Sequence, residues 1–299
     1  MTDRSFLILA HTGRPASILA AAAVARELNR LGGTSVCLDS QHPAVTAESD
    51  VDVKQLGVDI EPEAIELVIC LGGDGTILKA AEIMRGQTAP LLGVNMGHVG
   101  FLAELEPEDF ESTVGRVWNK DYSVDERMTI DVSVELNGAT VFETWALNEA
   151  SVEKMSRERM IEVVIGVDDR PISTFGCDGV LMATPTGSTA YSFSAGGPVV
   201  WPTVEALIMV PLSAHALFAR PLVTAPSSTL TVDLLSRNHA SGVLWCDGRR
   251  THTLAPGARV IARRSETPVR LARTHSGPFS ERLVQKFSLP TDGWRGRSS

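Results

Sequence analysis

The segment ICLGGDGTILKAA, residues 69–81, places an acidic residue inside a glycine-rich turn. An apolar run ends at Gly72 and Gly73, and Asp74, Gly75 and Thr76 then lead into a helix-like pattern. Glycines between a strand and a helix let backbone N–H groups approach a phosphate closely. The turn has neither the lysine of a P-loop nor the GxGxxG spacing of dinucleotide-binding folds. The segment therefore predicts a phosphate-binding turn of another kind.

Asp74 needs a physical reason, because a carboxylate beside a triphosphate is repelled unless something compensates. The carboxylate could face a hydroxyl and take its proton, or it could face a Mg²⁺ ion that the phosphates also bind. Either arrangement predicts phosphoryl transfer from a nucleotide to an alcohol. The alternative is a tight strand–helix turn in which Asp74 and Thr76 only cap the helix. The run of glycines favours a functional turn, because capping alone does not need so much backbone freedom.

A second segment, CDGVLMATPTGSTAYSFSAGGP at residues 177–198, is rich in hydroxyl groups and glycine. The hydroxyl-bearing residues are Thr184, Thr186, Ser188, Thr189, Ser192 and Ser194. Short donors on a flexible backbone suit sugar hydroxyls or phosphates, and Tyr191 offers a flat surface for a base. A long polar loop would be the ordinary explanation. It is the weaker one here, because this segment lies within an otherwise apolar β region.

The third candidate is the pair Asn148 and Glu149, which closes an apolar strand-like run. A carboxylate beside an amide can accept hydrogen bonds from both hydroxyls of a ribose diol. Taken alone, the pair is a weak signal and is more typical of a solvated strand end.

The first part of the chain must position the glycine turn. Strand-like runs at residues 5–10, 34–40, 66–73 and 89–97 alternate with helical patterns, which predicts a parallel sheet covered by helices on both faces. Ligands of such sheets bind at the carboxyl ends of the strands. Both glycine clusters, residues 72–75 and 97–100, are expected at that edge.

The character of the sequence changes near Tyr122, where apolar residues begin to alternate with polar ones. Asn137–Gly138 predicts a hairpin turn, and a second hairpin is expected at residues 168–171. We therefore expect an α/β nucleotide- and phosphate-binding domain at residues 1–120, completed by a C-terminal helix within 275–299. Residues 121–274 are expected to form an all-β, sandwich-like domain that binds the dinucleotide.

Composition narrows the classes of protein. The chain has 299 residues, 43% of them hydrophobic, and a net charge of −9, which disfavours a general nucleic-acid binder. The four cysteines are far apart, so neither a structural zinc site nor a disulfide framework is expected. An N-terminal apolar run is broken by His11 and Pro15, and no stretch reaches the length of a membrane span. We expect a cytoplasmic protein without membrane partners.

The motifs GGDGT, NE and DG…TPTGSTAYSFSAGGP, in that order, resemble those of the NAD kinases, and the resemblance covers nearly the whole chain. It implies an α/β domain followed by a β-sandwich-like domain, and a homodimer or homotetramer. It also implies transfer of the γ-phosphate of ATP, or in some relatives of polyphosphate, to the 2′-hydroxyl of the adenosine ribose of NAD, with Mg²⁺. Any metal would be carried by the nucleotide rather than by a protein site.

By this resemblance Asp74 is the general base, and Gly72, Gly73, Gly75 and Thr76 bind phosphate. A carboxylate is too weak a base to deprotonate a ribose hydroxyl in advance, so it must accept the proton late, as the oxygen bonds to phosphorus. The residues implied to bind NAD are Asp74, Gly75, Lys79, Asn148, Glu149, Arg159, Asp178, Thr189, Ala190, Tyr191, Ser192, Phe193 and Ser194. For Lys79 and Arg159, a solvated surface charge is the competing explanation.

Some positions depart from the family pattern. Gly176 stands two residues before Asp178, where many relatives carry a basic side chain, and Arg249 follows CDG, where some have glutamine. Either change could alter donor preference or phosphate contacts. His98, in the second glycine cluster, has no assigned role.

Two other functions remain open from the residues alone. A lipid kinase of the diacylglycerol or sphingosine kinase type shares the GGDGT turn, but TPTGSTAYSFS and the NE pair suit a dinucleotide better than an acyl chain. A non-catalytic dinucleotide sensor is disfavoured by the intact Asp74.

Overall fold

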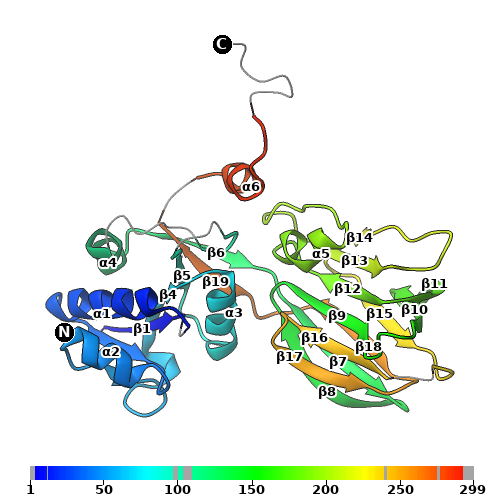
Figure 1. Cartoon of the computed structure of the whole chain (residues 1–299), viewed down its shortest axis with the longest axis horizontal. Coiled ribbons are helices and arrows are strands. Elements are labelled where there is room, and N and C mark those ends of the chain that lie inside the picture. Colours follow the sequence, from blue (N-terminus) through cyan, green and yellow to red (C-terminus); the bar gives the residue numbers. More distant parts are fainter. Residues whose placement is uncertain are drawn as a thin grey trace. The chain divides into compact units, whose positions relative to one another are not determined.

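The computed structural model describes residues 4–11, 13–96, 100–103, 110–238, 241–274 and 277–291. The chain forms two compact units, Met1–Glu126 with Val269–Ser299 and Arg127–Pro268 (Figure 1). Residues 121–126 and 269–274, which we expected in the β-rich domain, thus belong to the first unit. The reason is that β6 (Ser123–Arg127) and β19 (Val269–Arg273) extend the sheet of that unit.

Within the described residues, the first unit contains a seven-stranded sheet of order β3-β2-β1-β4-β5-β19-β6. Besides β6 and β19, its strands are β1 (Ser5–Ala10), β2 (Thr34–Cys37), β3 (Lys54–Gln55), β4 (Ile65–Leu71) and β5 (Leu91–Val94). The pairs from β3 through β5 to β19 are parallel. The continuous apolar runs of β1 and β4 are buried along their length, as expected for central strands of a parallel sheet. The predicted α/β domain is confirmed.

Helices accompany this sheet. They are α1 (Pro15–Arg30), α2 (His42–Ser49), the short η1 (Pro62–Ala64), α3 (Asp74–Ile83), α4 (Phe110–Trp118) and α6 (Phe279–Phe287). The core of the unit joins apolar residues of α1, such as Leu28, to strand residues such as Phe6, Ile69 and Leu92. Because β4 leads directly into α3, the turn between them lies at the carboxyl end of a central strand.

The second unit is a sandwich of two antiparallel sheets, each six-stranded within the described residues, with orders β11-β10-β15-β18-β7-β8 and β14-β13-β12-β9-β16-β17. The first sheet comprises β7 (Ile130–Leu136), β8 (Ala139–Ala146), β10 (Ile161–Val167), β11 (Arg170–Cys177), β15 (Leu230–Leu234) and β18 (Arg259–Arg264). The second comprises β9 (Glu149–Lys154), β12 (Gly179–Ala183), β13 (Leu207–Leu212), β14 (Leu222–Thr224), β16 (Gly242–Cys246) and β17 (Arg250–Leu254). The predicted sandwich is confirmed.

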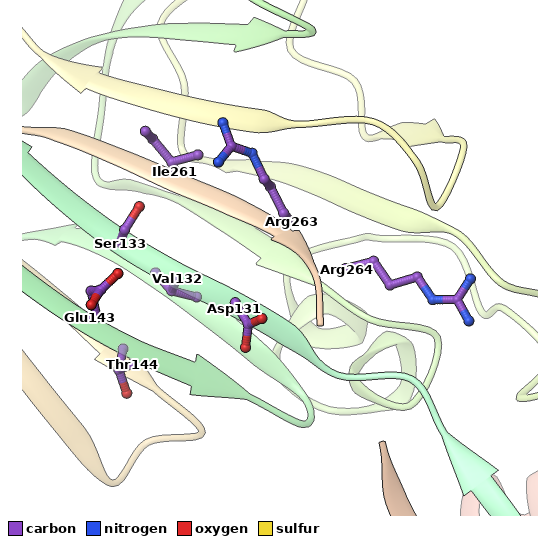
Figure 2. Close-up of a pocket in the computed structure, with 8 residues that line it drawn as sticks. All are labelled: Asp131, Val132, Ser133, Glu143, Thr144, Ile261, Arg263 and Arg264. Atoms are coloured by element: carbon purple, nitrogen blue, oxygen red, sulfur yellow. The ribbon is translucent and has the colours of Figure 1, made fainter. Parts of the chain in front are cut away.

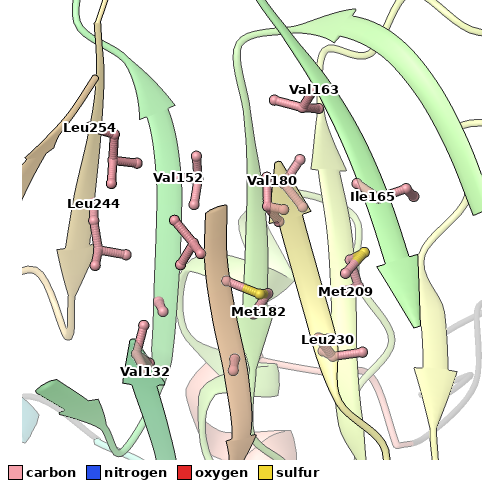
Figure 3. Packing of buried hydrophobic residues seen from close by; sticks show 14 of the residues in the cluster. Val132, Val152, Val163, Ile165, Val180, Met182, Met209, Leu230, Leu244 and Leu254 are labelled. Carbon is pink, nitrogen blue, oxygen red and sulfur yellow. The ribbon is translucent and has the colours of Figure 1, made fainter. Parts of the chain in front are cut away.

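Alternating residues of both sheets form one apolar core. Val132 and Val163 from the first sheet and Val152, Val180 and Leu244 from the second belong to this cluster (Figure 3). Tight turns link neighbouring strands, with positive φ at Asn137 and Gly138 before β8 and at Asp168 and Asp169 before β11. Both predicted hairpins are therefore present.

Candidate functional site

The glycine turn joins β4 to α3 within the first unit. A Cβ atom at Gly72 would lie 2.3 Å from the Oγ1 atom of Thr76, so local packing requires glycine there. At Gly73 and Gly75 an added Cβ would meet no described atom within 4 Å, and neither residue has a positive φ. The fold itself therefore explains Gly72 but not Gly73 or Gly75. The open space beside these two residues suits close approach of a phosphate.

The side chain of Asp74 does not cap α3, although it opens the helix. The N-cap is Gly73, and among the described residues no side chain caps this end of the helix. The Asp74 carboxylate instead accepts hydrogen bonds from the backbone N–H groups of Phe101 (3.1 Å), Leu102 (3.0 Å) and Ala103 (3.4 Å). These donors fix the orientation of the carboxylate, so Asp74 is positioned for a role other than capping.

Gly100 makes this arrangement possible. A Cβ atom at that position would lie 2.3 Å from Oδ1 of Asp74. The end of the second glycine cluster thus contacts the acidic residue of the first, at the edge of the sheet where sequence analysis expected both. His98 and the neighbouring residues 97 and 99 lie outside the described residues. Lys79 is partly buried on α3, five positions after Asp74.

In the second unit, Asn148 and Glu149 lie where β8 gives way to β9, and each is 8% exposed. Asn148 donates its backbone N–H to Asp247 Oδ1 (2.7 Å), and its carbonyl accepts the backbone N–H of Thr184 (2.9 Å). Strand pairing of β9 with β12 sets Glu149 opposite Ala183. The NE pair is therefore buried and held from two neighbouring segments, unlike a solvated strand end.

The carboxyl group of Glu149 has an unusual environment. The backbone N–H of Tyr191 donates to it, while its Oε2 atom is buried and has no hydrogen-bond partner among the described residues. Burial, followed by the charges of Asp247 and Glu153, raises the pKa of Glu149 to about 8. Since buried polar atoms are nearly always paired, an unpartnered carboxyl oxygen is suited to accept a hydrogen bond from a ligand hydroxyl.

In the long hydroxyl-rich segment, some side chains hold the local fold and others are exposed or lack a described hydrogen-bond partner. It contains η2 (Gly187–Thr189) and α5 (Tyr191–Ser194). Ser188 is structural, because its hydroxyl donates to the Pro185 carbonyl (2.7 Å) and accepts the Val200 N–H (3.0 Å). A Cβ at Gly187 would lie 2.0 Å from the Asn148 carbonyl oxygen, so glycine is needed where the two motifs meet.

The residues of α5 behave differently from Ser188. Tyr191 and Phe193 are 41% and 39% exposed, whereas Ser192 is buried and its Oγ has no partner among the described residues. Thr189 and Ala190 are partly buried and Ser194 is exposed. Burial, then the charges of Glu153, Glu149 and Asp178, raises the pKa of the Tyr191 phenol. Tyr191 thus lies in the electrostatic neighbourhood of two predicted site carboxylates.

The remaining predicted residues occupy more exposed positions. Asp178 forms an ion pair with Lys154 (2.5 Å), a contact that sequence analysis did not anticipate. Arg159 is exposed in the connection between β9 and β10, and Arg249 is exposed in the turn between β16 and β17. The structure thus gathers Asn148, Glu149 and Tyr191, with Asp178 in their electrostatic neighbourhood, in one unit, and it gathers the glycine turn, Asp74 and residues 100–103 in the other.

The sequence motifs did not point to Asp247, Arg250 or Trp145. Asp247 is buried and accepts the backbone N–H groups of Leu147 and Asn148, while Arg250 donates to it (2.7 Å). The Arg250 guanidinium also lies 4.4 Å from the centroid of the Trp145 ring. The CDG turn at residues 246–248 is visible in the sequence, but its distance along the chain from the NE pair does not show that the two are in contact.

A separate cavity of about 420 Å³ lies over β7, β8 and β18 (Figure 2). Its lining mixes two acidic and two basic side chains, Asp131, Glu143, Arg263 and Arg264. None of the predicted site residues lines it.

Among the described residues, no group of three or more His, Cys, Asp or Glu side chains could hold a metal ion. In the same part of the chain, no helix is both long and apolar enough to cross a bilayer.

The two-domain fold is shared with solved structures of dinucleotide kinases. The crystal structure of yeast NADH kinase complexed with NADH matches with a TM-score of 0.87 and 20% identity, over 98% of this chain and 89% of that one. An NAD kinase from Archaeoglobus fulgidus in complex with ATP matches with a TM-score of 0.71 and 24% identity, over 96% and 100% of the two chains.

Sequence comparison then defines the family. The model of the ATP-NAD kinase N-terminal domain matches residues 6–122, and that of the ATP-NAD kinase C-terminal domain matches residues 147–274. An NAD kinase of Leifsonia xyli is 59% identical, and the match covers 98% of this chain and 97% of that protein. An NAD kinase of Thermobifida fusca is 55% identical, and the match covers 100% of this chain and 93% of that protein. The chain belongs to the ATP-NAD kinase family, which is a family of phosphotransferases. The lipid-kinase alternative finds no support in these matches.

Proposed function

We propose that this protein transfers the γ-phosphate of ATP to the 2′-hydroxyl of the adenosine ribose of NAD, giving NADP and ADP. The observation that carries the proposal is the Asp74 carboxylate, which is held by backbone N–H groups beside an open glycine turn in a chain of this family. Gly72, Gly73, Gly75 and Thr76 bind the phosphates of the donor. Asp74 addresses the acceptor hydroxyl.

In the proposed step, the ribose 2′-oxygen forms a bond to the γ-phosphorus while the bond from that phosphorus to the β,γ-bridging oxygen breaks. The bridging oxygen keeps the bonding electrons and leaves with ADP. Asp74 accepts the hydroxyl proton as the new bond forms. Because little charge develops on the hydroxyl before then, a fixed orientation contributes more than a strong base would.

The dinucleotide is proposed to lie against the second motif set. Glu149 accepts a hydrogen bond from a ribose hydroxyl at its unpartnered oxygen, Asn148 supplies an amide beside it, and Tyr191 offers its ring to a base. The other proposed NAD contacts are Gly75, Lys79, Arg159, Asp178, Thr189, Ala190, Ser192, Phe193 and Ser194. Arg249 is a candidate for a phosphate contact.

Mg²⁺ is proposed to enter with the triphosphate, because phosphate oxygens and water fill most of its octahedral shell. Asp74 is not assigned to the ion, because it addresses the acceptor hydroxyl. When bound, the ion would neutralise charge on the transferring phosphoryl group. Polyphosphate remains the alternative donor, since the turn needs only phosphate oxygens. A cytoplasmic location is proposed with these substrates.

A homodimer or homotetramer is proposed from exposed apolar side chains along one edge of the second unit. Met160, Ile172, Leu217 and Phe218 are all exposed, and the backbone N–H of His215 donates to the Gly176 carbonyl (2.8 Å), joining the 213–221 loop to β11. Contiguous exposed apolar side chains are typical of association surfaces. Light scattering should give a multiple of 32.1 kDa, and Leu217→Asp with Phe218→Asp should reduce it.

The reaction is tested by incubating the protein with NAD, Mg²⁺ and either ATP or polyphosphate, and measuring NADP with an NADP-specific dehydrogenase. Asp74→Asn should retain NAD binding by calorimetry and lose turnover by at least about 100-fold. Asp59→Asn is the matched control, because Asp59 is an exposed carboxylate that accepts the backbone N–H of Gln55 at 2.8 Å. NAD binding without turnover by the parent protein would favour a sensor instead.

A further inference from the structure

Phe101 connects the C-terminal helix to the candidate catalytic residue. Its ring centroid lies 5.8 Å from that of Phe279 and 5.7 Å from that of Phe287, and the residue is 8% exposed. Phe279 and Phe287 stand at the two ends of α6, and a spacing of eight residues places them on the same face of a helix. The two rings of α6 therefore hold Phe101 from both ends of the helix.

The backbone of the same residue contacts Asp74. The N–H group of Phe101 donates to Asp74 Oδ2, and that of Leu102 donates to Oδ1. From α6 to the carboxylate there is thus a single intervening residue. The Leu102 carbonyl accepts a hydrogen bond from Arg273 Nη1 (3.3 Å) at the end of β19, so a second C-terminal element also anchors this loop.

Helix α6 is itself lightly packed. None of its residues is buried against the described part of the chain, although Leu283, Val284 and both phenylalanines are partly covered. Its ring contacts with Phe101 are among the contacts that hold it in place. A helix attached in this way contributes little to the core, yet its contact falls on the loop that orients Asp74.

We propose that α6 is a positioning element for Asp74: Phe279 and Phe287 hold Phe101, and Phe101 and Leu102 hold the carboxylate towards the acceptor hydroxyl. This inference rests on the proposed function. Gly100 leaves the loop backbone free to adopt other conformations once the rings are removed. A carboxylate that is misplaced by about 1 Å can slow an enzymatic step about 100-fold.

The test uses the full chain and the double variant Phe279→Ala/Phe287→Ala. Its kcat should fall by between about 10-fold and 100-fold, while KM for NAD and for ATP stays within about twofold. Phe279→Tyr/Phe287→Tyr keeps both rings and should restore kcat. Gln285→Ala, an exposed position on the same helix, is the matched control and should not change kcat. An unchanged kcat in the alanine variant would overturn the proposal.

Hydrogen exchange supplies a second readout. The amides of Phe101 and Leu102 should exchange faster in the alanine variant and at the parent rate in the tyrosine variant. Equal rises in both KM values, with a lower Tm and no change in these amides, would assign α6 a structural role and reject the proposal. If the parent protein makes no NADP, the proposed function fails, but the exchange measurement still tests whether α6 holds the loop.

Discussion

The carboxylate of Asp247 lies 2.7 Å from the backbone nitrogen of Asn148, which stands 99 positions earlier in the chain. The same carboxylate accepts the N–H of Leu147 and is paired with Arg250. Burial raises its pKa, and the backbone donors and Arg250 lower it, with burial the larger effect. A turn between β16 and β17 therefore sets the backbone of the NE pair.

Asp247→Ala should lower the free energy of unfolding by ~3 kcal/mol, because it leaves buried N–H groups and a guanidinium without their acceptor. The control is Asp168→Ala, since Asp168 also lies in a hairpin turn and accepts a backbone N–H, that of Thr229, at an exposed position. That variant should lose less than ~1 kcal/mol. Urea unfolding of both variants measures the difference, and equal losses would mean that the buried contact has no special weight.

Replacing Gly72 or Gly75 of the glycine turn with alanine should change stability in opposite directions. Gly72→Ala should destabilise the protein, because the new Cβ would lie 2.3 Å from Thr76 Oγ1. Gly75→Ala should raise stability by ~0.5–1 kcal/mol, because alanine favours the helix and no described atom lies within 4 Å of its Cβ. Thermal unfolding measures both changes.

The same Gly75→Ala variant should have a higher KM for ATP, since its methyl group occupies the space proposed for phosphate. A variant with raised Tm and impaired ATP binding would separate the ligand requirement from the fold requirement. Unchanged KM for ATP in a stabilised variant would place the phosphates elsewhere.

The sequence was sufficient for the elements but not for the contacts between them. Apolar runs and periodicity identified the parallel sheet, the sandwich and both hairpins, because each pattern is local. Asp74 and Glu149 were predicted as site residues from their neighbours in the chain, and they remain predictions. Their hydrogen-bond partners were not predicted, because Asp74 is held by backbone N–H groups, which every residue except proline carries and which leave no signature in the sequence.

Gly100→Ala should impair catalysis by moving Asp74. The added Cβ would lie 2.3 Å from Oδ1, so the carboxylate or the loop must shift. We expect kcat to fall by at least about 10-fold, with smaller changes in KM, because no group that touches substrate is removed. Gly115→Ala on α4 is a suitable control, because no described atom lies within 4 Å of its added Cβ. Steady-state kinetics of the two variants decide whether the position of Asp74 matters as well as its charge.

Glu149 makes stability depend on pH. Its pKa of about 8 in the folded protein exceeds the ordinary value of 4.5, mainly because of burial. Below pH 4.5 both folded and unfolded chains carry the proton, so the group costs nothing. Between these values the folded chain retains a proton that the unfolded chain has released, so the free energy of unfolding falls progressively as the pH rises from 4.5 to about 8 and changes no further above that value.

Glu149→Gln replaces the carboxyl with a neutral group of similar shape and removes this dependence. Its Tm should exceed that of the parent at pH 9, and the difference should shrink as the pH is lowered towards 5. The gain in free energy of unfolding at pH 9 is about 1.4 kcal/mol for each unit by which folding raises the pKa of Glu149. Comparing the two proteins at each pH largely cancels the contributions of Glu153 and Asp247, whose carboxyl groups also act on Glu149. A difference that stayed constant from pH 5 to pH 9 would mean that the Glu149 carboxyl is ionised throughout. An effect other than burial and the charges of Asp247 and Glu153 would then stabilise the unpartnered oxygen.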